Sequence, residues 1–175
     1  RTTKKLKKDC DVNFKILDDD ETSILSKIVN NKAHTLNKKK IKHILDENFL
    51  NYFIELKKRN KELFNISLLE INKEMISANM GFIYKKTFYY YLPTIFSNKY
   101  NKFSPGKILI FYLIGWCIKN NIKTFDFGIG DEDYKKYWSN KSINIFRYIE
   151  YKSFKGFFFY ILLKIYIFLS KIKKN

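Results

Sequence analysis

Two stretches of the sequence decide the fold: KFSPGKIL at 102–109 and KTFDFGIGDEDYKKYW at 123–138. In the first stretch, Ser104 is a favoured residue immediately before a helix, and Pro105 suits the first helical position. The residues that follow, up to 118, are almost entirely apolar, and Asn120 with Asn121 marks the far end. We expect a helix that is covered by a sheet and by a further element, and that lies deep in the domain.

The second stretch predicts a strand followed by a short helix. IKTFDFGIG is typical of a buried strand that ends at Gly128 or Gly130, and DEDYKKYW of a helix entered through acidic residues. The helix that opens at Pro105 lies between this strand and an earlier one, and the order strand, helix, strand predicts a parallel crossover. The carboxylates at 131–133 are explained as first-turn residues, so no metal site is expected.

In residues 63–97, before these stretches, the helical spacing of apolar residues gives way to alternation at every second position or to continuous apolar runs. LFNISLLEIN (63–72), EMISANMGFIYKK (74–86) and TFYYYLPTIFS (87–97) are rich in β-branched and aromatic residues. They predict three consecutive antiparallel strands, with a tight turn at Asn72-Lys73 and a second connection near Lys85-Lys86. Further strands are predicted at 12–17 and at 142–153.

Two helices are expected between the first strand and the three-strand segment, over 21–36 and over about 39–61. Asp18, Asp19 and Asp20 precede the first of them, where carboxylates cap a helix N-terminus. The predicted fold class is therefore α/β: a mixed, mostly antiparallel sheet with a central parallel strand pair, flanked by helices. Residues 1–150 form this domain.

Residues 151–175 are expected to form a basic, apolar C-terminal helix. The run from 157 to 169 is apolar apart from Lys164 and has lysines on both sides, but it is shorter than the roughly 17–25 residues that span a bilayer. It either lies in a membrane interface or packs against the domain or a partner domain. Because the chain opens at Arg1, a further N-terminal portion is expected.

The net charge of the chain indicates an anionic partner but does not identify which kind. The chain has 34 Lys+Arg against 17 Asp+Glu, a net charge of +17 that attracts nucleic acid, anionic lipid or phosphorylated cofactors. An AT-rich genome explains the abundance of lysine as well, so nucleic acid is not the expected partner. Cys10 and Cys117 are too few for a disulfide framework, and residues 1–25 lack a signal-peptide pattern. We expect a cytoplasmic protein, with peripheral contact at the cytoplasmic membrane face as an addition.

The turn before the helix at 105 is a candidate phosphate site. An opening of Ser104, Pro105 and Gly106 leaves backbone N–H groups without helical partners, and glycine lets a ligand approach closely. Lys102 and Lys107 flank the turn and add positive charge. We therefore assign the segment 104–107 to the diphosphate of a cofactor.

Asp126 and Tyr134 are the candidates for proton transfer. If the phenylalanines of FDF share one face of their strand, Asp126 lies on the other, and a buried carboxylate must be hydrogen-bonded, paired or functional. Tyr134 and Lys135 follow at the mouth of the strand, and a tyrosine can protonate a departing thiolate. Gly128 belongs to a lone GxG, and we group it with Lys135 as cofactor-binding.

KFSPGKIL followed by KTFDFGIGDEDYKKYW resembles the GNAT superfamily of acyltransferases. More narrowly, the pair is similar to acetyltransferases of the cellulose-biosynthesis type, which are related in fold to FemAB-like peptidoglycan transferases. The resemblance extends to about residue 150 and is carried by Ser104, Pro105, Gly106, Leu109, Asp126, Gly130, Tyr134 and Lys135. It implies two splayed parallel strands that accept the pantetheine arm of acetyl-CoA or another acyl-CoA, with the pyrophosphate at Ser104 and without a metal.

The resemblance implies an acyl-CoA-dependent N- or O-acyltransferase that acts on an amino sugar or another cell-envelope component. SPGK is shorter than the usual glycine-rich phosphate loop, and TFYYYLPTIF lacks the carboxylate base that many members place there. Asp126 is therefore the first choice of base, with Glu70, Glu74 or a water-relayed path as substitutes. Two alternatives are a FemAB-like transferase that uses aminoacyl-tRNA, and a non-catalytic module that binds membranes or polyanions.

Overall fold

The computed structural model describes residues 10–17, 22–146 and 148–172. The described residues up to Tyr137 form one compact unit, and those from Trp138 onward form a second. The expected domain boundary at residue 150 stays a prediction. The carboxylates predicted to cap the first helix, Asp18, Asp19 and Asp20, lie outside the described residues.

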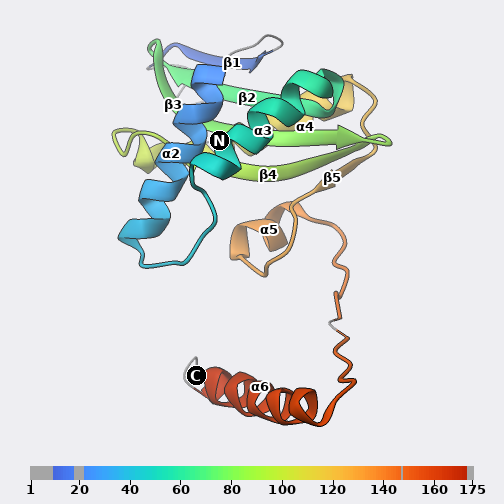
Figure 1. Cartoon of the computed structure of the whole chain (residues 1–175). Helices are drawn as coiled ribbons and strands as arrows, with labels where there is room; N and C mark the ends of the chain where they lie inside the picture. Colours follow the sequence, from blue (N-terminus) through green and yellow to red (C-terminus); the bar gives the residue numbers. More distant parts are fainter. Residues whose placement is uncertain (1–9, 18–21, 147, 173–175) are drawn as a thin grey trace. The chain divides into compact units, whose positions relative to one another are not determined.

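A five-stranded sheet forms the centre of the first unit, in the order β1-β2-β3-β4-β5 (Figure 1). The first four strands pair antiparallel, and β5 pairs parallel with β4. Their bounds are β1 Val12–Leu17, β2 Phe64–Ile71, β3 Glu74–Tyr84, β4 Thr87–Ile95 and β5 Thr124–Asp126. This confirms the predicted α/β fold with a mixed, mostly antiparallel sheet. The parallel pair lies at the sheet edge and not at its centre, because the described residues after β5 add no strand.

Both predicted hairpin turns are confirmed. Asn72 and Lys73 have φ angles of 52° and 65°, and Lys85 and Lys86 have φ angles of 45° and 61°. Two consecutive residues with positive φ make the tight turn whose twist matches that of antiparallel strands. These turns connect β2 to β3 and β3 to β4 and help to set the register of the three strands.

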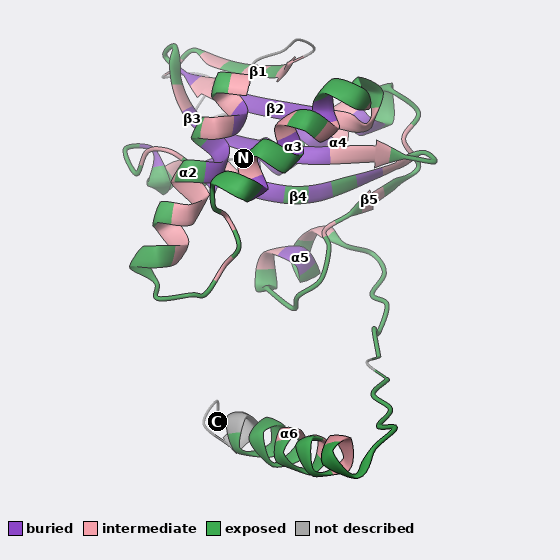
Figure 2. Cartoon of the chain, viewed as in Figure 1, coloured by how far each residue is buried: buried purple, intermediate pink, exposed green. Residues whose placement is uncertain are grey.

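Helices cover both faces of the sheet (Figures 1 and 2). Their bounds in the first unit are α2 Thr22–Lys38, α3 Glu47–Arg59, η1 Lys61–Leu63, η2 Asn101–Phe103, α4 Pro105–Lys119 and α5 Asp133–Trp138. Even-numbered side chains of β2 and β3, such as Ile66 and Met80, pack with Leu25 of α2. Odd-numbered ones face α4, where the Ser77 hydroxyl donates to the Pro105 carbonyl at 3.5 Å. The core therefore has two layers, one on each face.

Helix α4 begins close to where the sequence predicts it, but its burial differs. Ile108 and Leu113 are buried against the sheet, whereas Phe111 and Ile118 are 52% and 70% exposed. The expectation that α4 is covered on nearly every side is wrong, because these outer apolar side chains are exposed. The apolar outer side chains are thus part of the surface of this unit.

Helix α3 begins later than predicted. Helix α2 ends at Lys38, and Lys40 has a left-handed φ of 55°, a conformation that interrupts a helix. Asp46 accepts a hydrogen bond from the Phe49 amide at 2.8 Å and caps the new helix. The expected continuous helix from about 39 is therefore wrong, and residues 39–46 form a loop.

In its described residues the second unit contains one helix, α6 Phe154–Ile172, and the expected division into 1–150 and a C-terminal helix over 151–175 stays a prediction. The strand predicted over 142–153 is not formed in the described part of this segment, since neither 142–146 nor 148–153 joins the sheet. In the described ranges, none of the helices combines the length and apolar character needed to cross a membrane. The short helix predicted after β5 is confirmed as α5.

Candidate functional site

A cleft opens where β4 and β5 part. The two strands pair only between Thr87–Tyr89 and Thr124–Asp126, while β4 continues to Ile95. Gly128 and Gly130 have φ angles of 70° and 127°, and these conformations turn the chain away after β5. The edge of β4 beyond the pairing therefore has no strand beside it among the described residues, and the parallel strands are splayed.

A cavity of about 940 Å³ lies at this opening. It is lined by α2, by β4 beyond the paired residues, by the turn that begins α4, and by the segment that leads into α5. All of these segments belong to the first unit. A ligand in the cavity therefore touches both faces of the sheet edge.

Strand β4 carries a bulge beside the cavity. Leu92 pairs with Met80 and Tyr90 pairs with Gly81, so Tyr91 is the extra residue of β4. A bulge interrupts the ladder and changes the direction of the backbone, and bulges are frequent next to active sites. Tyr90 lines the cavity on one side of the bulge, and Pro93, Thr94 and Ile95 line it on the other.

The turn before α4 forms one end of the cavity, and the four residues expected to bind the cofactor diphosphate, Ser104, Pro105, Gly106 and Lys107, all line it. Proline has no N–H, and the amides of Lys107 and Ile108 donate to the Ser104 carbonyl at 2.9 and 3.2 Å. The Gly106 N–H is left without a partner among the described residues, at the positive end of the helix dipole. This geometry is suited to an anion.

Ser104 does not cap α4 with its side chain, which corrects the sequence prediction. Its φ and ψ are 53° and 65°, a left-handed conformation, and its side chain makes no capping hydrogen bond. A non-glycine residue in this region costs roughly 1–2 kcal/mol, and such strain concentrates at functional sites. The helix instead begins from the Ser104 carbonyl, which leaves the exposed hydroxyl on the cavity side.

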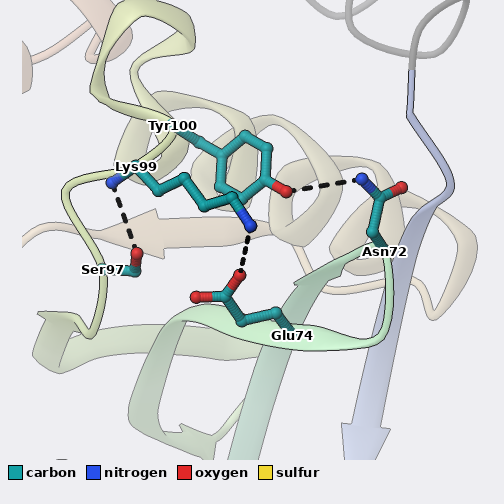
Figure 3. A network of polar contacts seen from close by, with 5 residues as sticks. All are labelled: Asn72, Glu74, Ser97, Lys99 and Tyr100. Atoms are coloured by element: carbon teal, nitrogen blue, oxygen red, sulfur yellow. Dashed lines mark hydrogen bonds and ion pairs between the residues drawn. The ribbon is translucent and has the colours of Figure 1, made fainter.

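A polar network holds the chain that leads into this turn (Figure 3). The Lys99 ammonium lies 3.2 Å from the Glu74 carboxylate, and the Asn72 amide donates to the Tyr100 hydroxyl at 3.4 Å. The Lys99 amide also donates to the Ser97 hydroxyl at 3.3 Å. The network joins the β2–β3 turn to the segment before α4. Glu74, a substitute base in the sequence prediction, is engaged here and does not line the cavity.

Two tyrosines, Tyr90 of β4 and Tyr134 of α5, line the cavity together. Both rings pack on Phe127, with centroid distances of 6.0 and 6.3 Å. Burial raises the pKa of both hydroxyls, and the charge of Glu132 raises the pKa of Tyr134 further. Both phenols therefore stay protonated at neutral pH and can donate a proton. The sequence indicates Tyr134 as a candidate. It does not indicate Tyr90, which is identified only by the alternating burial along β4 in the structure.

Helix α2 contributes residues that the sequence does not single out. The Asn31 amide donates to the Thr94 hydroxyl at 2.6 Å, which fastens α2 to the end of β4. Lys32 lines the cavity and is half-buried. Burial and the charge of Lys39 lower the pKa of Lys32, while the charge of Glu132 acts in the opposite direction. In the sequence, these residues have only the pattern of an ordinary amphipathic helix.

Asp126 is exposed and does not line the cavity. Its carboxylate accepts a hydrogen bond from the Gly128 amide at 2.7 Å. The expectation of a carboxylate on a strand covered on both sides is wrong, because β5 has three residues and lies at the sheet edge. Gly128 also lies outside the lining. The catalytic role of Asp126 and the cofactor-binding role of Gly128 stay predictions.

Lys135 and Glu70 are engaged outside the cavity. The buried Lys135 ammonium donates to the Ile129 carbonyl at 2.6 Å and pairs with the Glu132 carboxylate at 2.8 Å. Glu70 of β2 pairs with Lys15 of β1 at 2.7 Å. Neither residue lines the cavity, and the roles expected for them stay predictions.

Comparison with known families matches a model described as "Acetyltransferase (GNAT) domain" over residues 1–136. This range contains every residue that lines the cavity. Comparison with curated protein sequences gives no match.

Solved structures with the same fold include three acetyltransferases. A possible acetyltransferase from Clostridium difficile 630 has 11% identity and a TM-score of 0.60, covering 81% of this chain and 99% of its own. A predicted acetyltransferase with acetyl-CoA from Clostridium acetobutylicum has 15% identity and a TM-score of 0.54, covering 79% and 96%. Glucosamine-6-phosphate N-acetyltransferase from Arabidopsis thaliana has 16% identity and a TM-score of 0.50, covering 79% and 99%. At these identities the similarity concerns the fold.

Proposed function

The chain belongs to the acetyltransferase (GNAT) domain family and is an acyltransferase of that type, and from this premise we propose that it transfers an acyl group from a coenzyme A thioester to an amino group. The observation that carries the proposal is the cavity at the open edge of β4, with the turn at Ser104 at one end. Acetyl-CoA is the proposed donor, and the acceptor enters from the side of α2.

The turn at 104–107 is proposed to bind the diphosphate of the donor. The free Gly106 N–H and the helix dipole attract a negative charge, and the exposed Lys107 ammonium adds a full positive charge. The exposed edge of β4 offers backbone groups to the amides of the pantetheine arm, as a neighbouring strand would. The thioester then reaches the cavity beside the bulge at Tyr91.

In the proposed reaction, the acceptor nitrogen attacks the thioester carbonyl carbon and forms a tetrahedral oxyanion. We propose that backbone N–H groups of β4 near the bulge stabilise that charge. The C–S bond then breaks, and the departing thiolate takes a proton from the Tyr134 hydroxyl, which its raised pKa keeps protonated. Tyr90 packs on the same Phe127 ring and keeps the site dry around Tyr134.

The amine must also lose a proton. Among the described residues that line the cavity, Glu132 is the only carboxylate, and its bond to Lys135 lowers its pKa and keeps it ionised at neutral pH. We assign the proton to a water-relayed path that ends at Glu132. Asp126 holds the turn after β5 through the Gly128 amide, and we assign it a positioning role.

We propose an amino sugar or another cell-envelope component as the acceptor, with the chain acting in the cytoplasm. The narrower resemblance to the cellulose-biosynthesis type of acetyltransferase supports this choice, and one structural neighbour is named as an acetyltransferase of an amino sugar. The two alternatives, transfer from aminoacyl-tRNA and a non-catalytic binding module, both predict no binding of acetyl-CoA, so one titration separates the proposal from them.

Calorimetric titration of the full chain with acetyl-CoA tests the proposal. We expect saturable binding, and we expect Gly106→Ala to weaken it at least about tenfold, because a methyl group there blocks close approach to the backbone. The variant should fold, since a Cβ at Gly106 would meet only Ile95 Cδ1, at 3.7 Å. Gly115→Ala, in the same helix with open space around it, is the matched control. Absence of heat with acetyl-CoA would contradict the proposal.

A further inference from the structure

The wall of the cavity formed by α2 and the residues just after it is strongly basic. Lys32, Lys38 and Lys39 all line the cavity. The only carboxylate among the described lining residues, Glu132, is already paired with the Lys135 ammonium at 2.8 Å. Three lysines thus stand against this one carboxylate, whose charge also acts on Lys32, and the wall keeps a net positive charge among the described residues.

Lys32 is the central residue of this wall. It is half-buried, and no hydrogen bond or ion pair to another described residue engages its ammonium group. Burial and the nearby Lys39 both disfavour its charged form and lower its pKa, and the charge of Glu132 offsets them only in part. A cation that is partly removed from water needs a compensating anion, and the cavity that Lys32 faces is where such an anion would enter.

The basic wall is separate from the proposed diphosphate site. Helix α2 packs on one face of the sheet, and α4, which begins at the diphosphate turn, packs on the other. The hydrogen bonds from Asn31 to the Thr94 hydroxyl and to the Ile95 carbonyl, at 2.6 and 2.8 Å, hold α2 against the end of β4. A donor whose diphosphate lies at Ser104 leaves the α2 wall to the acceptor.

We propose that the acceptor carries a phosphate or a similarly compact anionic group, and that Lys32 and Lys39 bind this group beside the reacting amine. The inference rests on the proposed acyl transfer and adds the substrate class to it. Two ammonium groups and one anion form charge-assisted contacts in a partly dry cavity, where such contacts are strongest. Polycationic acceptors are repelled by the same wall.

Steady-state kinetics of the full chain with glucosamine 6-phosphate and glucosamine as acceptors, and acetyl-CoA as donor, tests the class. We expect kcat/KM for the phosphorylated acceptor to exceed that for the neutral one at least about tenfold, the size of one charge-assisted contact. Lys32→Met should remove this preference through a higher acceptor KM. Lys27→Met, an exposed residue of the same helix outside the lining, is the matched control.

The other source of a phosphate monoester is the 3′-phosphate of coenzyme A. If that group occupied the wall, Lys32→Met would raise the KM for acetyl-CoA but not for its 3′-dephospho form, and the proposal would be overturned. An unchanged acceptor preference in Lys32→Met would also overturn it. In both outcomes the unmodified chain still binds acetyl-CoA, whereas loss of donor binding in the unmodified chain would overturn the acyltransferase proposal itself.

A binding measurement covers the case in which neither sugar is turned over. With coenzyme A at saturation, inorganic phosphate should raise the Tm of the unmodified chain and of Lys27→Met, because a ligand that binds the native state stabilises it. It should leave the Tm of Lys32→Met almost unchanged. An equal increase in all three chains would contradict the inference, since the phosphate would then bind elsewhere.

Discussion

At the scale of single residues, the candidate site depends on how the surroundings change the chemistry of common side chains. The chain has 13 tyrosines, and composition gives none of them a special role. Tyr134 differs because burial and the charge of Glu132 raise its pKa while it lines the cavity. Tyr90 shares both properties but is buried, so we assign the role of proton donor to Tyr134, the more accessible of the two tyrosines.

Tyr134→Phe should lower kcat by about 10²-fold or more, the usual contribution of a general acid, with little change in the KM for acetyl-CoA. The raised pKa predicts that the phenol loses its proton only at alkaline pH, so kcat should fall there in the unmodified enzyme. The variant should lack this alkaline limb. Tyr137→Phe, an exposed residue of the same helix, is the control, and equal losses in both variants would rule out the assigned role.

Asp126→Asn should retain most of the turnover. The side-chain oxygen of asparagine can still accept the hydrogen bond from the Gly128 amide that the carboxylate now accepts at 2.7 Å. Asp126→Ala, which removes that acceptor, should lower kcat by loosening the turn after β5. A dead Asp126→Asn enzyme that remains folded by circular dichroism would instead identify Asp126 as the base.

At the scale of elements, the bulge between β3 and β4 depends on close contact between backbones. A Cβ added at Gly81 would lie 2.7 Å from Phe88 Cζ, 2.8 Å from the Tyr89 carbonyl oxygen and 2.9 Å from Asn79 Nδ2. These distances are too short for any side chain. Packing therefore favours glycine at position 81 of β3. The φ angle of Gly81 is not in the range that favours glycine.

Gly81→Ala should destabilise the protein by about 1–3 kcal/mol, the range for overpacking a well-packed core. Urea denaturation followed by circular dichroism measures the change. Gly115→Ala, with nothing within 4 Å of the added carbon, should be neutral or slightly stabilising, because alanine favours a helix over glycine. Similar midpoints for Gly81→Ala and the unmodified chain would show that β4 shifts freely.

At the scale of the whole molecule, the cavity and the C-terminal helix belong to different units. Helix α6 carries large exposed apolar side chains, including Phe159 at 71% and Leu162 at 63%. Lysines precede and follow its apolar run in the sequence, a composition that suits a membrane interface. Acyl transfer and surface attachment are therefore expected to be separable.

A chain that ends at residue 150 should still bind acetyl-CoA, because every residue that lines the cavity lies before it. We expect the full chain to sediment with anionic phospholipid vesicles more strongly than the shortened chain, and neutral vesicles to be the control. Equal sedimentation of both chains would assign the attraction to the net charge of +17 and not to α6.

The sequence by itself determined the elements whose signals are local. Paired residues with positive φ at Asn72-Lys73 and Lys85-Lys86 set the hairpins, and the Pro105-Gly106 opening set the start of α4. These signals act over a few residues, so they survive without knowledge of the rest of the chain. The turn at 104–107 follows from the same local signal, and its diphosphate-binding role stays a prediction.

Only the tertiary structure decided which side chains share the cavity and how far each is buried. Asn31 meets Thr94 across 63 positions of sequence, and Lys32, Tyr90 and Tyr134 line one cavity from three different elements. The prediction that Asp126 is buried is wrong, because the burial of a strand depends on its neighbours. In the described sheet β5 has a neighbouring strand on one side only. Burial and proximity are properties of the packed fold, and no local pattern encodes them.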